Sequence, residues 1–232
     1  MNATRPQAVP LSALPPRRNG YVDLRSYAAI GDGRTVALIS HDGSVDWYPI
    51  PDLDSAPAFA RLLDAEHGGC IELCPDERFE VEREYLPGTN ILQTTYTTAS
   101  GRVQVTDSLN LGSTGRLPWN ELARAVEGLE GTVAMRWRVA PGTMFNTVSP
   151  WVDVTAHKPV LRASEVSVGM CGEHVGESKV EEQQISGSFR TTPGSQHLLA
   201  VVATHSEPLR LPTPREIRKN LEMTRETWLR WG

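Results

Sequence analysis

The sequence predicts an all-β protein, organised as one large antiparallel β-sandwich. Two observations support this prediction: short runs of apolar or alternating residues fill most of the chain, and Gly and Pro turn signals separate them. With 232 residues, 39% of them hydrophobic, the chain is long enough to bury a substantial core. We expect a disordered, proline-rich arm over 1–20, the sandwich over 21–211 and a connector helix over 212–232.

Strands are predicted at 35–40, 45–48, 102–106, 133–139, 166–170 and 198–202. The clearest alternation places Val133, Met135, Trp137 and Val139 on one face. The run 198–202 is apolar at every position, which is typical of a central strand buried on both faces. Residues 56–64, which bring Phe59 together with two leucines, predict a short helix instead.

The last segment predicts an amphipathic helix. Thr213 is placed as its N-cap, Pro214 as its first residue and Glu216 as the partner that completes a capping box. The apolar stripe of this helix consists of Ile217, Leu221, Trp228 and Trp231. We expect these four residues to form an interface with a further domain, because no other segment is predicted to cover them.

Composition excludes several classes of protein. A net charge of −5 does not favour nucleic-acid binding, and no apolar run approaches the ~20 residues that cross a membrane. Residues 1–20 lack the apolar stretch of a signal peptide. Three cysteines, an odd number, favour a reducing compartment over a disulfide framework. We therefore expect a cytoplasmic protein; the sequence leaves a homo-oligomer open.

Metal and cofactor motifs are absent at the level of the sequence. Gly31-Asp32-Gly33 has Val36 where a dinucleotide loop needs its third glycine, so it predicts a turn. Cys70 and Cys74 fall on one strand, which would hold their sulfurs roughly 13 Å apart, too far for one zinc ion. We expect no cofactor and no metal.

Catalytic residues are not predicted either. The chain has no Gly-x-Ser-x-Gly elbow, and its histidines show no spacing that would orient a triad. Acidic residues at 173, 177, 181 and 182 are read as a solvated loop, and the sequence defines no catalytic acid pair.

The segment 46–63 is the strongest candidate for a binding loop. Its prolines exclude an ordinary central strand, and rigid loops of this kind often position functional side chains. An indole face suits the apolar surface of a sugar, and carboxylates accept hydrogen bonds from hydroxyl groups. Trp47, Asp52 and Asp54 are therefore candidate substrate contacts, while a purely structural loop capped by Asp54 or Ser55 remains the alternative.

A family resemblance covers most of positions 27 to 109. It rests on 30–32, 34–40, 42–47, Pro51, 54–55, 59–64, 83–94 and 103–107, with a weaker match over 131–141. These segments resemble the N-terminal domain of bacterial glycoside hydrolase family 15 proteins, the trehalase-like and glucoamylase-like group. The final helix resembles the connector of that family.

The resemblance implies a β-sandwich that precedes a catalytic barrel of paired α-helices. In such proteins two glutamates of the barrel hydrolyse α-glucosidic bonds with inversion, one as general acid and the other activating water. No residue here matches the barrel, so we expect this chain to be non-catalytic. Its expected partners are the barrel and, through it, an α-glucoside such as trehalose or an α-glucan oligosaccharide.

One alternative function belongs to a different class. The chain could be a stand-alone carbohydrate-binding or assembly module, with its final helix folded back onto its own sheet. An uncovered apolar stripe should promote self-association, whereas a folded-back helix should not. The behaviour of the helix therefore distinguishes the two hypotheses.

Overall fold

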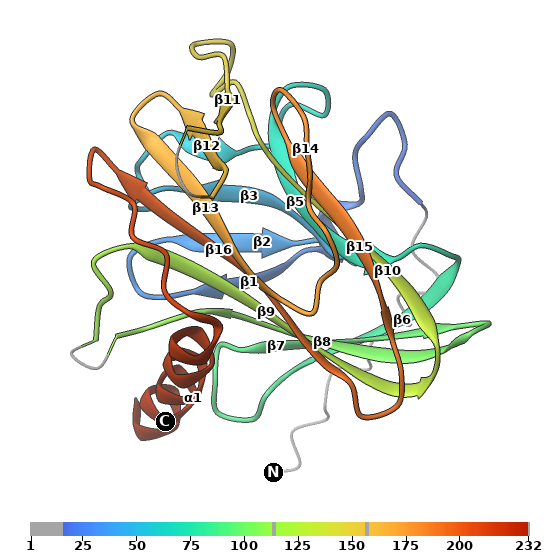
Figure 1. The fold of residues 1–232 in the computed structure, drawn as a ribbon. Helices are drawn as coiled ribbons and strands as arrows, with labels where there is room; N and C mark the ends of the chain where they lie inside the picture. Colours follow the sequence, from blue (N-terminus) through green and yellow to red (C-terminus); the bar gives the residue numbers. More distant parts are fainter. Residues whose placement is uncertain (1–15, 113–114, 156–157, 232) are drawn as a thin grey trace.

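The computed structural model describes residues 16–112, 115–155 and 158–231 (Figure 1). Within these residues the chain forms two antiparallel eight-stranded sheets, a short 3-10 helix η2 (Leu24–Ser26) and a long helix α1 (Pro214–Trp231). The first sheet has the order β1-β2-β3-β5-β10-β15-β14, with β4 paired to β3. The second has the order β11-β12-β13-β16-β9-β8-β7-β6. The predicted all-β sandwich is confirmed.

The strands of the first sheet are β1 (Ala28–Gly31), β2 (Val36–Ile39), β3 (Ser44–Pro49), β4 (Pro57–Phe59), β5 (Gly69–Pro75), β10 (Val133–Pro141), β14 (Lys179–Val180) and β15 (Ile185–Thr191). Those of the second are β6 (Phe79–Tyr85), β7 (Leu92–Thr98), β8 (Gly101–Leu109), β9 (Asn120–Gly131), β11 (Trp151–Asp153), β12 (Val160–Ala163), β13 (Val166–Glu173) and β16 (Gln196–His205). Each of the six predicted strands corresponds to one of these elements.

The core lies between the two sheets and is built by alternating residues. Val133, Met135, Trp137 and Val139 of β10 all point into it, as their spacing predicts. The Trp137 indole is buried, and its N–H donates to the carbonyl of Val175 at 2.8 Å. This bond satisfies the one polar atom that the indole brings into the core.

The predicted helix over 56–64 is wrong. Residues 57–59 form β4 instead, which pairs with β3 through Tyr48↔Phe59 and is followed by turns. The rings of Tyr48 and Phe59 stack with their centroids 6.3 Å apart, and both are fully buried. This strand pairing outweighs the local helical pattern, as tertiary packing often does.

Helix α1 lies against the outer face of the second sheet. Ile217 is fully buried there among Ala123, Cys171, Leu198 and Ala200, with Leu221 beside them. This contact explains why residues 198–202 of the central strand β16 are all apolar. Leu199 and Val201 face the core between the sheets, whereas Leu198 and Ala200 face the helix.

Residues 1–15 of the predicted arm lie outside the described residues. Residues 16–20 are described, and the Arg17 guanidinium donates to Asp42 at 2.6 Å and to Asp46 at 2.7 Å. The described part of the predicted arm is therefore tied to the sandwich.

Candidate interdomain surface

Three loops meet at the end of the sandwich where the predicted substrate contacts lie. Arg34, between β1 and β2, donates from its guanidinium to Asp52 Oδ1 at 3.3 Å, to the carbonyl of Pro51 at 3.3 Å and to that of Leu117 at 3.2 Å. Asn120 adds a bond to the same Pro51 carbonyl at 2.9 Å. Arg34 thus joins the β1–β2, β3–β4 and β8–β9 loops into one unit.

Asp32 shapes the first of these loops. Its Oδ1 accepts from the backbone N–H groups of Arg34 and Thr35, both at 2.9 Å, while the Thr35 hydroxyl donates to the carbonyl of Pro49 at 2.7 Å. Aspartate commonly closes turns through such local bonds. The interpretation of Gly31-Asp32-Gly33 as a turn fits these contacts.

Asp52 and Asp54 both lie exposed on the β3–β4 loop, and the Asp52 side chain is 53% exposed. Leu53 between them is 60% exposed. Trp47 is partly buried on β3, opposite Leu38. Within the described residues, no hydrogen bond connects Trp47 to either aspartate, so the structure joins Asp52 to Arg34 and leaves the tryptophan apart.

The N-terminus of α1 is capped as its sequence predicts. The Thr213 hydroxyl accepts from the Glu216 N–H at 3.3 Å, and the Glu216 carboxylate accepts from the Thr213 N–H at 2.7 Å. This reciprocal pair is a capping box. The backbone N–H of Leu111 donates to Thr224 at 2.7 Å, which ties the middle of the helix to the β8–β9 loop.

The expectation that the whole stripe of α1 awaits a partner is wrong at Ile217, which is fully buried in this chain. Leu221 is partly buried beside it. The C-terminal half of the stripe differs, because Trp231 is 73% exposed and Leu229 is 51% exposed. Only this half is available to a further domain.

Trp228 and Trp231 form an edge-to-face pair with centroids 5.3 Å apart. They line a shallow hollow of about 430 Å³ together with the β6–β7 loop, residues 85–90. Asn90 of that loop accepts from the N–H of Gly31, next to the Arg34 unit. The tryptophan pair and the two aspartates therefore lie on one continuous stretch of loops, which we call the rim surface: residues 31–34, 50–55, 85–90, 117–120 and 228–231.

A buried carboxylate anchors the helix beneath this surface. Glu121 is 1% exposed and accepts from Trp119 at 2.8 Å, from Asn110 at 2.8 Å and from Asn220 of α1 at 3.0 Å. Such bonds offset the cost of burying the carboxylate. Sequence reasoning missed Glu121, because its partners are distant in the chain and its spacing carries no signal.

A second polar cluster holds the first sheet together. Asp46 is fully buried and accepts from Arg17, Arg61 and the hydroxyls of Tyr27 and Ser44. Burial, and then the neighbouring Asp46 carboxylate, raise the pKa of Tyr27 well above its usual value. Asp46 is thus a structural residue.

Glu72 adjoins this cluster. It pairs with Arg61 at 2.6 Å and with Arg138 at 3.0 Å. Burial alone would raise the pKa of Glu72, but the hydrogen bond from Arg138 and the charge of Arg61 lower it to about 2. The carboxylate is therefore ionised at neutral pH and cannot supply a proton there.

The cysteines do not assemble a metal site. Among the described residues, no group of three or more His, Cys, Asp and Glu side chains could hold an ion. Cys70, Cys74 and Cys171 are buried free thiols. Burial raises the pKa of both Cys70 and Cys74 to about 11, so these thiols are protonated at neutral pH.

Helix α1 is amphipathic and packs on a sheet. Within the described part of the chain, no helix combines the length and apolar character that membrane crossing requires.

Fold and surface together define a class: a β-sandwich domain with an attached helix and an exposed apolar rim. Residues 21–180 match the family described as "Trehalase-like, N-terminal". The chain therefore belongs to the trehalase-like N-terminal domain family.

Several curated relatives are trehalases. The chain is 23% identical over 218 residues to a trehalase of Thermoplasma volcanium. This alignment covers 92% of this chain and 34% of that protein. It is 36% identical over 115 residues to a trehalase of Mycolicibacterium smegmatis, covering 49% of this chain and 16% of that protein. A trehalase of Thermoplasma acidophilum is 24% identical over 200 residues. The chain thus spans about a third or less of the length of these relatives.

Proposed function

We propose that this chain is the non-catalytic N-terminal sandwich of a glycoside hydrolase family 15-like enzyme that cleaves α-glucosidic bonds. Its role is to support a following α/α barrel, in which an inverting acid/base mechanism operates. The observation that favours this most is its alignment with only 34% of the Thermoplasma volcanium trehalase. The remainder of such a protein provides the room for a catalytic domain.

The rim surface is the proposed contact with that barrel. It gathers four exposed large apolar side chains, Leu53, Tyr85, Leu229 and Trp231, at one end of the sandwich. Burying each of them against a partner contributes roughly 1.5–3 kcal/mol at most, and less where the side chain is already half-covered. Of the four residues first expected at this interface, Trp228 and Trp231 retain that role, whereas Ile217 and Leu221 anchor the helix.

The exposed aspartates of the rim are proposed to reach the edge of the barrel's pocket. Asp52 is held by Arg34 and Asp54 has its carboxylate in solvent, so both offer acceptors for sugar hydroxyls. Trp47 remains a proposed contribution to the same edge. The free thiols are consistent with a cytoplasmic location, which is also part of the proposal.

The proposal is tested in two arms. The 232-residue chain by itself, assayed with trehalose, maltose and starch, should show no turnover; activity well above background would contradict it. In the longer protein, Asp54→Ala should raise KM or lower kcat, because a hydroxyl contact is lost. Asp76→Ala, an exposed aspartate in the turn after β5, is the matched control. Unchanged kinetics in a folded Asp54→Ala protein would remove the sugar contact.

A stand-alone carbohydrate-binding or assembly module remains the second candidate. The packing of Ile217 onto the chain's own sheet favours it, because half of the helix needs no partner. The two candidates differ in whether the exposed Trp231 end of α1 makes this chain associate with other molecules in solution.

A further inference from the structure

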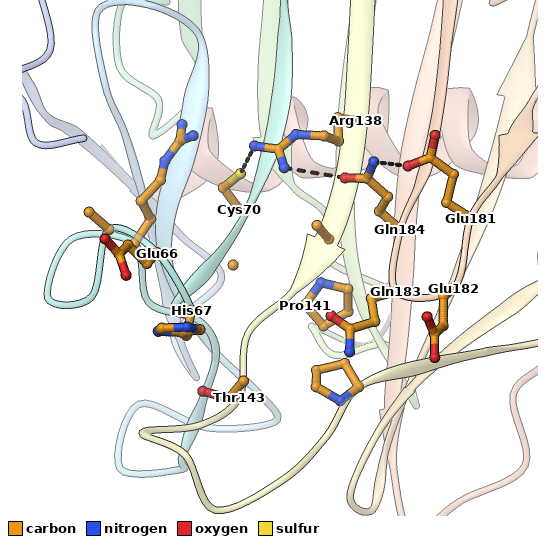
Figure 2. A pocket seen from close by; sticks show the side chains of 15 residues that line it. Glu66, His67, Cys70, Arg138, Pro141, Thr143, Glu181, Glu182, Gln183 and Gln184 are labelled. Atoms are coloured by element: carbon orange, nitrogen blue, oxygen red, sulfur yellow. Dashed lines mark hydrogen bonds between the residues drawn. The ribbon is translucent and has the colours of Figure 1, made fainter. Parts of the chain in front are cut away.

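A second hollow (Figure 2) lies on the outer face of the first sheet. Helix α1, by contrast, packs on the outer face of the second sheet. The volume of the hollow is about 410 Å³, within the ~300–1,000 Å³ typical of small-molecule pockets. The start of β5 and the end of β10 form its floor, and there Cys70 and Arg138 point away from the core. Residues 65–67, 143, 150 and 181–184 form its walls.

Hydrogen bonds connect the side chains of the floor of this hollow. Arg138 donates to Glu72 at 3.0 Å. It also donates to Cys70 Sγ at 3.2 Å and to Gln184 at 3.3 Å, and Gln184 in turn donates to Glu181 (Figure 2). These bonds link β5, β10 and the 181–184 segment. A ligand would therefore meet polar groups that are already positioned.

Other polar groups of the walls have their hydrogen-bonding capacity open. Among the described residues, no hydrogen bond engages the side chains of Glu66, Glu182 or Gln183, and the His67 side chain is 55% exposed. Figure 2 shows Glu182 and Gln183 on one wall and Glu66 and His67 on the other. Carboxylates accept hydrogen bonds, the glutamine amide both donates and accepts them, and an imidazole nitrogen either donates or accepts one.

Two exposed aromatic residues flank these walls in the sequence. Trp151 is 52% exposed and follows Pro150, and the next residue, Val152, donates its N–H to the carbonyl of Glu182 at 3.0 Å. Phe145 is 51% exposed and stands two residues after Thr143.

The turn that carries Phe145 has an unusual backbone. Met144, Phe145 and Asn146 have φ of 48°, 61° and 62°, a left-handed conformation that non-glycine residues rarely adopt. The buried Met144 and the bond from the Asn146 N–H to the Thr143 hydroxyl at 3.1 Å hold it. Such strain is concentrated at functional sites in proteins.

We propose that this hollow binds an uncharged oligosaccharide. The open carboxylates and the amide match the many hydroxyl groups of a sugar, and the apolar part of the lining, which includes Ala140, Pro141 and Pro150, matches its apolar ring surface. Three carboxylates, of Glu66, Glu181 and Glu182, disfavour an anionic ligand. That the sugar is an α-glucoside rests on the proposed function; that the hollow binds a sugar does not.

The test measures binding by the 232-residue chain itself. Maltoheptaose, trehalose and cellohexaose are titrated by isothermal calorimetry, and retardation is followed in native gels cast with soluble starch. We expect saturable binding of maltoheptaose, weakened about tenfold by Glu182→Gln and by Gln183→Ala, a change that corresponds to ~1.4 kcal/mol. Both residues are exposed, so both variants should fold.

The matched control is Glu80→Gln, at an exposed glutamate of β6, which should bind like the unmodified chain. Absence of saturable binding for all three sugars would overturn the proposal, as would binding that neither variant at the hollow weakens. Binding of cellohexaose in place of maltoheptaose would retain the site and remove the α-glucoside assignment. None of these results bears on the turnover assays, so the two proposals fail separately.

Discussion

Glu72 illustrates how single residues set the stability of this sandwich. It lies on β5 with its side chain 15% exposed, and it receives guanidinium groups from Arg61, in the turn after β4, and from Arg138 of β10. The carboxylate therefore joins three segments of the first sheet. Its pKa of about 2 in the folded chain compares with an ordinary value of 4.5.

This shift predicts a pH-dependent stability. Because the folded pKa is lowered, the contribution of Glu72 is complete above pH 4.5 and is lost as the pH falls from 4.5 towards 2. Its size is about 3 kcal/mol, as an order of magnitude. Urea unfolding of Glu72→Gln should show a large loss of stability at pH 7 that shrinks below pH 4.5.

Glu80→Gln is the control for this experiment, since Glu80 is exposed on β6. Its free energy of unfolding should follow that of the unmodified chain at every pH. Parallel pH profiles for the chain and for Glu72→Gln would show that the ion pairs do not stabilise the fold.

At the scale of elements, α1 has two halves with different roles. Ile217 is fully buried against the outer face of the second sheet, whereas Trp231 is 73% exposed. Thr224 and Asn220 add bonds to the β8–β9 loop and to Glu121. The first half is therefore part of the domain, and the second half displays apolar surface.

This division predicts unequal effects of two truncations. Ile217→Ala should lower the free energy of unfolding by about 2–4 kcal/mol, because it leaves a cavity between helix and sheet. Trp231→Ala should stay within about 0.5 kcal/mol, as exposed substitutions usually do. Chemical denaturation followed by circular dichroism measures both, and equal losses would mean that Trp231 is covered in solution.

The sequence predicted elements well where the period of the apolar residues was regular. The alternation over 133–139 identified β10, and the capping residues identified the start of α1. The helix predicted over 56–64 was wrong, because Phe59 pairs with Tyr48 of β3. The local apolar pattern around Phe59 carries no sign of this strand pairing. The partner of Ile217 was missed as well, although the fully apolar run 198–202 already indicates a strand covered on both faces.

The candidate sites were less predictable for a related reason. Asp52 and Asp54 were found because a proline-rich loop is visible in the sequence. Arg34, which fixes that loop, stands within one of the segments that carry the family resemblance, and its role depends on Leu117, which is 83 residues away. The hollow around Arg138 likewise combines segments from three parts of the chain, so only the fold assembles it.

At the scale of the whole molecule, a buried arginine connects the two sheets. Arg124 on β9 is fully buried; it pairs with Asp107 at 2.7 Å and donates to the carbonyl of Gly43, in the β2–β3 hairpin, at 2.9 Å. Gly43 has φ of 81°, and a Cβ there would lie 2.3 Å from the carbonyl oxygen of Leu73. The same Cβ would lie 2.6 Å from the Tyr96 hydroxyl of the second sheet, so only glycine fits where the hairpin meets β5 and the second sheet.

The exposed end of α1 is the part of the rim surface that should control whether copies of this chain associate with one another. Leu229 and Trp231 expose apolar surface beside the partly covered Trp228, and contiguous patches of this kind promote contacts between molecules. We predict concentration-dependent self-association of the 232-residue chain in sedimentation velocity, reduced by the double substitution Leu229→Ser with Trp231→Ser. Leu24→Ser, at a 74% exposed leucine in η2, is the matched control and should leave the association unchanged. A strictly monomeric chain at every concentration would instead favour the stand-alone module, because the tryptophan pair would then need no partner.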